Sequence, residues 1–321
     1  MAGGTCPGDR TPRFIMADFL CNGFLSRDVS ALIAVYRLLY SEAAFELFPI
    51  VPIPFREHLF NSKKAMRIAY WETDGVTESV PAMKRGMKIA KKILEEKGYE
   101  LVPFNPQKFS RKAFILLCEA LAVDGSVDVI KILNEDIRVC KGNKLSFTIL
   151  QLPRLIQSLI AYAARPVLGE FPSEVAGTLR LGRHPHDMNL FRERVIQLRK
   201  DFHKEMKEGN FDAILCPAFA CPALPFDVLP DALGAATYTC IFNILNLPAG
   251  VVPVTKVSLQ DEKEMQNYPG NVNSYQKAIK NGLLQDSVGL PIAVQIASRQ
   301  YHEEVVLKLM KEIEENVNYH A

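Results

Sequence analysis

Two short apolar segments separated by an amphipathic stretch constrain the fold of this chain more than any other feature. The segments "MRIAYW" (66–71) and "YELVPF" (99–104) have the composition of strands, and residues 79–97 between them have helical periodicity. Pro81 near the start of that stretch and Gly98 just past its end fit the two boundaries of a helix. Strand, helix and strand joined by short links predict a right-handed crossover in a mainly parallel sheet, and therefore an α/β fold.

The rest of the chain continues this alternation. Residues 25–40 predict a helix with Ser26 as its N-cap and Asp28 in its first turn, and Thr73-Asp74-Gly75 predict a turn. Two further helices are expected at 186–206 and 302–317. Three further strands are expected at 211–219, 251–254 and 288–297. In "ILNLPAGVVPV" (244–254), Pro248 and Gly250 predict a turn that leads into the strand. One α/β domain over 26–321 accounts for these elements, after an irregular lead-in over 1–25.

Composition and motifs exclude several classes of protein. A net charge of +2 with 23% charged residues gives no polyelectrolyte character that would favour nucleic acid. No apolar run reaches the roughly 18 residues of a membrane span, and the first residues lack a signal-peptide pattern, so we expect an intracellular, unsecreted protein. Seven scattered cysteines without a CxxC motif predict reduced thiols.

Motifs for catalysis and metal binding are also missing. No G-x-S-x-G, Walker, GxGxxG or HExxH motif is present. His184, His186 and Asp187 surround Pro185 without a second group of ligand residues, so we interpret them as a surface loop and expect neither metal nor cofactor. A Cys–His nucleophile pair stays open, because sequence does not reveal which residues are neighbours in space.

Residues 144–168 differ from the rest of the chain. No acidic residue occurs between Asp136 and Glu170, whereas five basic residues do. Two helical pieces joined near Pro153 would form either a core helix pair or an interfacial helix in a lipid headgroup layer. Anionic lipid would add about 1 kcal/mol for each nearby Lys or Arg. On the interfacial interpretation, the membrane-contacting residues are Leu152, Arg154, Leu155, Ile156, Leu159, Ile160, Tyr162 and Arg165.

Seven segments together carry a resemblance to a known family. They are "FLSRDVSALIAVYRLL", "IPFREHLF", "MRIAYWETDGVTESVPAMKRGM", "GYELVPF", "FDAILCPAFACPAL", "NLPAGVVPVTKV" and "SVGLPIAVQIA". In this order they resemble the fatty-acid amide hydrolases of the amidase-signature family, over about residues 22–317. The resemblance implies a mixed sheet surrounded by helices. It also implies hydrolysis of fatty-acid amides such as N-acylethanolamines to fatty acid and amine, by a Ser–Ser–Lys triad in which lysine is the base.

The sequence departs from that family where the chemistry is carried out. In the family, the triad and a Gly/Ser-rich oxyanion loop precede the segment that matches "GFLSRDV", and only about twenty unrelated residues precede it here. No catalytic residue therefore carries over. We expect a truncated form whose amidase fold is incomplete at its amino-terminal side and which is catalytically incompetent alone.

The segments that face lipid in the family do have counterparts in this sequence. Residues 144–179 correspond to the membrane-cap helices, and Leu121, Leu233, Ala236 and Cys240 correspond to the acyl-chain channel, with "NLPAGVVPV" as the sheet edge beneath it. Tyr301 stands where we expect a family tryptophan.

The resemblance also implies partners and a location. They are a lipid amide or fatty acyl ligand, a monotopic membrane surface of endoplasmic-reticulum type, and a homodimer or a heterodimer with a full-length homologue. A cytoplasmic location stays open. A different interpretation is a non-catalytic lipid-binding or regulatory partner of such a homologue. A third is an incomplete core that aggregates.

Overall fold

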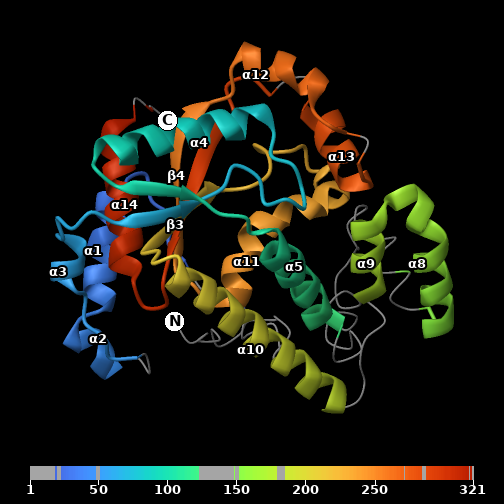
Figure 1. Cartoon of the computed structure of the whole chain (residues 1–321), viewed down its shortest axis with the longest axis horizontal. Helices are drawn as coiled ribbons and strands as arrows, with labels where there is room; N and C mark the ends of the chain where they lie inside the picture. Colours follow the sequence, from blue (N-terminus) through green and yellow to red (C-terminus); the bar gives the residue numbers. More distant parts are fainter. Residues whose placement is uncertain are drawn as a thin grey trace.

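A mixed five-stranded sheet forms the centre of the computed structural model (Figure 1), within the described residues 19, 23–47, 51–122, 148, 152–178, 185–270, 272–283, 287–317 and 319. Its strand order is β2-β1-β3-β5-β4. The strands are β1 (Arg67–Tyr70), β2 (Glu100–Pro103), β3 (Ala213–Pro217), β4 (Ala249–Lys256) and β5 (Pro291–Ser298). The expected strands are all present, with ends that differ by a few residues.

The predicted crossover is confirmed. Helix α4 (Pro81–Glu96) connects β1 to β2, which pair in parallel from Arg67↔Glu100 to Tyr70↔Pro103. Gly98 after the helix has a φ of 87°, a conformation that glycine adopts without steric cost. The expectation of a mainly parallel sheet holds for β1, β2 and β3, but the sheet is mixed, because β5 runs antiparallel to both β3 and β4. The crossover pattern fixes the direction of β1 and β2 only, and the mixed sheet agrees with what the family resemblance implies.

Helices cover both faces of this sheet (Figure 1). Helices α1, α4 and α14 pack on one face around Ile68 and Leu215, and helices α5, α10 and α11 pack on the other around Ala69 and Ile214. This alternation follows from the two-residue period of a strand. The bounds are α1 (Val29–Leu39), α2 (Glu42–Leu47), α3 (Glu57–Phe60), α5 (Gln107–Ala122), α8 (Arg154–Leu168), α9 (Glu170–Thr178), α10 (Pro185–Glu208), α11 (Thr237–Leu245), α12 (Leu259–Glu264), α13 (Ser274–Leu283) and α14 (Glu303–Asn316), with 3₁₀ segments η2 (Leu229–Ala236) and η3 (Met265–Asn267).

The start of α1 differs from its prediction. Asp28, not Ser26, is the N-cap: its extended backbone lets Oδ1 accept a hydrogen bond from the Ala31 N–H at 2.8 Å. Ser26 lies two residues before the N-cap, and its hydroxyl oxygen accepts a hydrogen bond from the Asp28 N–H at 3.4 Å. Both residue types suit the N-cap, and the register of the buried face, with Val29 and Ile33, selects Asp28.

The turn before β4 also lies earlier than expected. Asn246 ends α11 in the left-handed region, with a φ of 55°, and β4 already begins at Ala249. Gly250 is therefore a strand residue, and its lack of a side chain serves packing: a Cβ there would lie 2.2 Å from Met310 Sδ. Among the described strands β4 lies at the edge of the sheet as expected, and its position beneath an acyl-chain channel stays a prediction.

Parts of the predicted domain organisation lie outside the described residues. Of the lead-in over 1–25, only Phe19 and residues 23–25 are described, and of 144–151 only Thr148. The proposed division into lead-in and domain therefore stays a prediction.

Candidate functional site

Three helices meet in a small apolar cluster beside the sheet, which we call the α5–α9–α11 cluster. Its buried members are Phe114 and Cys118 of α5, Phe171 and Val175 of α9, and Cys240 of α11. Partly buried apolar side chains pack against them, among them Val76, Ala236 and Tyr275. The cluster joins residues that are far apart in the sequence into one apolar surface.

The predicted channel residues divide between this cluster and its surroundings. Cys240 and Ala236 belong to it, whereas Leu233 on η2 is 47% exposed and lies outside it. The backbone of Leu121 lies near the end of α5, and its side chain is outside the described residues.

Tyr301 is not part of the cluster, and its correspondence to a family tryptophan stays a prediction. It lines a cavity at the start of α14 instead. The tyrosine that packs against the cluster is Tyr275, whose ring centroid lies 6.0 Å from that of Phe171. Sequence reasoning missed Phe114, Phe171 and Tyr275, because no motif marks them and only the packing of three helices brings them together.

An ion pair holds α9 in place against α5. Nη2 of Arg111 lies 2.6 Å from Glu174 Oε2 and 3.4 Å from Glu170 Oε1. The guanidinium carbon also lies 5.6 Å from the centroid of the Phe171 ring. These contacts fix the helix that carries Phe171, although half-exposed ion pairs of this kind contribute at most about 1 kcal/mol.

Helix α8 packs on α9 and lies at the periphery of the molecule (Figure 1). Leu155, Leu159, Tyr162 and Val167 are 68–82% exposed. Of the other predicted membrane contacts, Ile156, Ile160 and Arg165 are exposed, Leu152 is half-buried, and the side chain of Arg154 is outside the described residues. No described helix is both long and apolar enough to cross a bilayer. The described part of this segment is therefore not a core helix pair, and its membrane contact stays a prediction.

The loop after β1 contains a buried carboxyl group, and the backbone N–H of the same residue donates to Tyr238 on the helix that carries Cys240. Asp74 is fully buried, and its Oδ1 accepts hydrogen bonds from the N–H groups of Val76 and Thr77, both at 2.9 Å. No described residue donates a hydrogen bond to its Oδ2. Burial raises the pKa of Asp74 to about 6, although the Thr237 hydroxyl and the two backbone N–H groups act in the opposite direction.

The described cysteines are packing groups. Cys118, Cys216, Cys221 and Cys240 are free and buried. Burial raises the pKa of Cys118 and of Cys221 to about 12, and raises the pKa of the other two thiols well above its ordinary value. At neutral pH none of these four thiols forms a thiolate, which argues against a Cys–His nucleophile pair that involves them.

Within the described residues, no set of ligand side chains could hold a metal ion. The side chains of His184, His186 and Asp187 lie outside that part of the chain. The buried lysine Lys308 donates to the Ser62 carbonyl oxygen and lies 3.7 Å from Glu312 Oε1. No lysine ammonium donates to a serine hydroxyl in the ranges that the structure describes.

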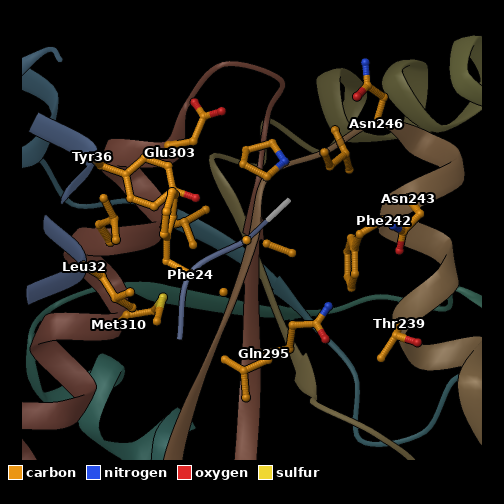
Figure 2. Close-up of a pocket in the computed structure, with 18 of the residues that line it drawn as sticks. Phe24, Leu32, Tyr36, Thr239, Phe242, Asn243, Asn246, Gln295, Glu303 and Met310 are labelled. Carbon is orange, nitrogen blue, oxygen red and sulfur yellow. The ribbon is translucent and has the colours of Figure 1, made fainter. Parts of the chain in front are cut away.

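A cavity of about 390 Å³ lies at the edge of β4 and is lined by residues of α11 other than the cluster members Ala236 and Cys240 (Figure 2). Leu32, Tyr36 and Met310, from α1 and α14, form one wall, and Phe242 and Asn246 belong to the opposite one. Gln295 of β5 lies between the two walls.

Comparison with known proteins settles the family. The family model described as Amidase matches residues 12–307. The chain belongs to the amidase family. Its similarity to fatty-acid amide hydrolase 1 of Sus scrofa is 33% identity over 299 residues, which is 91% of this chain and 50% of that protein. Fatty acid amide hydrolase 1 of Caenorhabditis elegans is 32% identical over 297 residues, which is 91% of this chain and 51% of that protein.

Solved structures agree with the amidase fold. A fatty acid amide hydrolase structure aligns with a TM-score of 0.61 at 17% identity, over 90% of this chain and 47% of that one. The structure of 6-aminohexanoate cyclic dimer hydrolase with its substrate aligns with a TM-score of 0.57 at 12% identity, over 92% of this chain and 54% of that one. This amidase-family chain therefore spans about half the length of the curated relatives it matches.

Proposed function

We propose that this chain is fatty-acid amide hydrolase-like and that its α5–α9–α11 cluster contacts the acyl chain of a fatty-acid amide. One observation carries the proposal: Ala236 and Cys240, the channel residues expected from the family resemblance, pack with Phe171 on the helix that supports α8. Two of its fatty-acid amide hydrolase relatives are 32–33% identical over 91% of the chain.

The chemistry of the cluster suits an acyl chain. Its members are aromatic rings, aliphatic groups and neutral thiols, none of which binds water strongly. Each methylene buried there contributes about 0.8 kcal/mol, so affinity should rise with chain length. Specificity for the amide head group would depend on other residues.

In this proposal α8 brings the lipid from a bilayer surface to the cluster. The exposed Leu155, Leu159, Tyr162 and Val167 would enter the headgroup layer, and Arg165 would pair with anionic lipid. The protein would then be monotopic on internal membranes. The short distance along the chain from α8 to Phe171 supports this route.

We further propose that residues 1–321 alone bind such an amide without hydrolysing it. The chemistry that the family resemblance implies needs a lysine base and two serines, and no Lys–Ser hydrogen bond occurs in the described ranges. Incubation with oleamide should release no oleate. Turnover that a serine-directed fluorophosphonate abolishes would contradict this part of the proposal.

Oleamide binding, measured by titration calorimetry, tests the acyl site itself. Ala236→Phe fills the surface of the cluster and should weaken binding at least tenfold, whereas Cys240→Ala should change affinity only a few-fold. Cys221→Ala removes a similarly buried thiol from a different part of the core and should leave affinity unchanged. Wild-type affinity in Ala236→Phe, or no binding by the wild-type chain, would contradict the proposal.

The exposed face of α8 also favours a second candidate function, a non-catalytic membrane-binding or regulatory partner of a full-length homologue. Such a chain would form a heterodimer and change the activity of, for example, the Sus scrofa relative. If adding the purified chain leaves both the oligomeric state and the turnover of that enzyme unchanged, this candidate fails.

A further inference from the structure

A second cavity, of about 640 Å³, is lined by three separate segments of the chain. They are the segment after α3, the turn between α4 and β2, and α14. The charged residues of this lining are four lysines and one glutamate, namely Lys63, Lys97, Lys308, Lys311 and Glu312. The cavity therefore carries an excess of positive charge.

The two lysines of α14 balance carboxylates of their own helix. Lys308 is buried, and its Nζ lies 3.7 Å from Oε1 of Glu312, the carboxylate that lines the cavity. The same oxygen accepts a hydrogen bond from the Tyr99 hydroxyl at 2.9 Å. Nζ of Lys311 lies 2.9 Å from Glu314 Oε2. The negative charge of Glu312 is thus already compensated within the fold.

Lys63 and Lys97, by contrast, make no ion pair with any residue that the structure describes. Both side chains are exposed, and they belong to different walls of the cavity. Within the described ranges, the Lys63 backbone N–H and the Ser62 hydroxyl group also donate to no acceptor. The residues that line this cavity therefore offer four unused donor groups, and two of these groups are cationic.

The turn after α4 leaves room for a ligand beside these donors. The Leu94 and Glu95 carbonyl oxygens at the end of the helix accept hydrogen bonds from the N–H groups of Tyr99 and Gly98, at 3.1 and 2.9 Å. This capping reduces the negative charge that the helix presents at its C-terminus. A Cβ on Gly98 would meet no atom within 4 Å, so open space adjoins the turn.

We propose that this cavity binds the phosphate monoester group of a small soluble molecule, with the Lys63 and Lys97 ammonium groups as its two cationic partners. A phosphate monoester carries about two negative charges and three acceptor oxygens at neutral pH, which matches two unpaired cations with further donors beside them. The cavity is much larger than a phosphate group, and the aromatic residues Phe60 and Tyr99 also line it. The ligand should therefore have an apolar or aromatic body.

The position of the cavity favours a soluble ligand over a lipid head group. Helices α3 and α14 lie at the opposite end of the molecule from α8 (Figure 1). A bilayer that contacts α8, as proposed above, would be remote from Lys63 and Lys97.

Titration calorimetry of the full chain with adenosine monophosphate tests the site, because adenosine is a control ligand that lacks only the phosphate group. We expect the phosphate to improve affinity about tenfold or more. Lys63→Gln combined with Lys97→Gln should remove this gain. The matched control combines Lys64→Gln with Lys88→Gln, which removes the same net charge from two exposed lysines outside the lining and should leave affinity unchanged.

Three results would overturn the proposal. They are the absence of adenosine monophosphate binding by the wild-type chain, equal affinity for adenosine, and an equal loss of affinity in the two double variants. Phosphatidate vesicles distinguish the other source of a phosphate monoester. Vesicle binding that the Lys63 and Lys97 double variant abolishes, and with which adenosine monophosphate does not compete, would assign the cavity to a lipid head group and also overturn it. Ala236→Phe should leave binding of adenosine monophosphate unchanged, so failure of the acyl-site proposal and failure of this one are distinguishable.

Discussion

The hydroxyl group of Tyr238 on α11 accepts a hydrogen bond from the backbone N–H of Asp74 at 3.1 Å and donates one to the Thr77 carbonyl oxygen at 2.7 Å. The Thr77 hydroxyl in turn donates to the Gly234 carbonyl oxygen at 2.8 Å. These buried bonds join the loop after β1 to the η2–α11 segment. They therefore help to position Ala236 and Cys240, the two predicted channel residues in the α5–α9–α11 cluster.

Tyr238→Phe should lower the free energy of unfolding by about 2 kcal/mol, because it leaves a buried N–H and a buried carbonyl unpaired. Chemical denaturation measures this change. Tyr70→Phe is the control, since it removes a half-exposed hydroxyl that accepts a hydrogen bond from Lys91, and should cost less than about 0.5 kcal/mol. Equal losses in the two variants would show that the Tyr238 hydroxyl has no special role.

Asp74 should make the protein less stable as the pH rises from about 4 to about 6. Its pKa is about 6 in the folded chain, mainly because of burial, against about 3.9 in an unfolded one. The folded state therefore binds more protons in this window, so the stabilisation is complete below pH 4 and lost above pH 6. This pH-dependent loss of unfolding free energy is at most about 3 kcal/mol, and Asp74→Asn should remove it. Denaturation curves recorded from pH 4 to pH 8 measure the difference.

Asp261→Asn is the matched control for that titration. Burial acts against ionisation of Asp261, but hydrogen bonds from Arg85 and Ser258 outweigh it and lower its pKa. The stabilisation that ionised Asp261 contributes to the fold is lost as the pH falls, whereas the stabilisation from Asp74 is lost as the pH rises. A wild-type profile that Asp74→Asn leaves unchanged between pH 4 and pH 6 would contradict the assignment to Asp74.

Changing Leu155, Leu159 and Ile160 together to Asp should reduce co-sedimentation with anionic liposomes at least tenfold. The substitutions put three charges on the exposed face of α8, which would otherwise enter the headgroup layer. The control changes Leu38, Leu47 and Leu259 to Asp, three exposed leucines on other helices, and should pellet like the wild type. If the α8 variant pellets like the control, α8 is not the membrane contact.

Gly250→Ala should destabilise the fold by about 1–3 kcal/mol, because its new Cβ would lie 2.2 Å from Met310 Sδ. Met310→Ala alone also destabilises, through a buried cavity. In the double variant the methyl group enters the space that Met310 leaves, so the combined loss should be smaller than the sum. Additive losses in thermal unfolding would indicate that the two residues do not share that space.

Local patterns in the sequence predicted the five strands and the helices α1, α4, α8, α10 and α14, whereas α5, α11, α12 and α13 were not predicted. The periodicity of residues 79–97 predicts α4 because a helix with one buried face needs apolar residues every three to four positions. The resemblance of "NLPAGVVPVTKV" and "SVGLPIAVQIA" to an amidase family was likewise readable, and the family match over 12–307 bears it out. In the predicted elements the boundaries moved by a few residues, as at Asp28, where Ser26 two residues earlier is also a residue type that caps helices.

Tertiary structure alone decided what the sequence left open. The same "TDG" that predicts a turn became the site of a buried carboxyl with a raised pKa, because packing of η2 and α11 removes Asp74 from water. The antiparallel course of β5 and the position of Gln295 opposite Val251 depend on long-range pairing. Periodicity records which residues a strand buries, but its partner and direction depend on contacts between residues far apart in the chain.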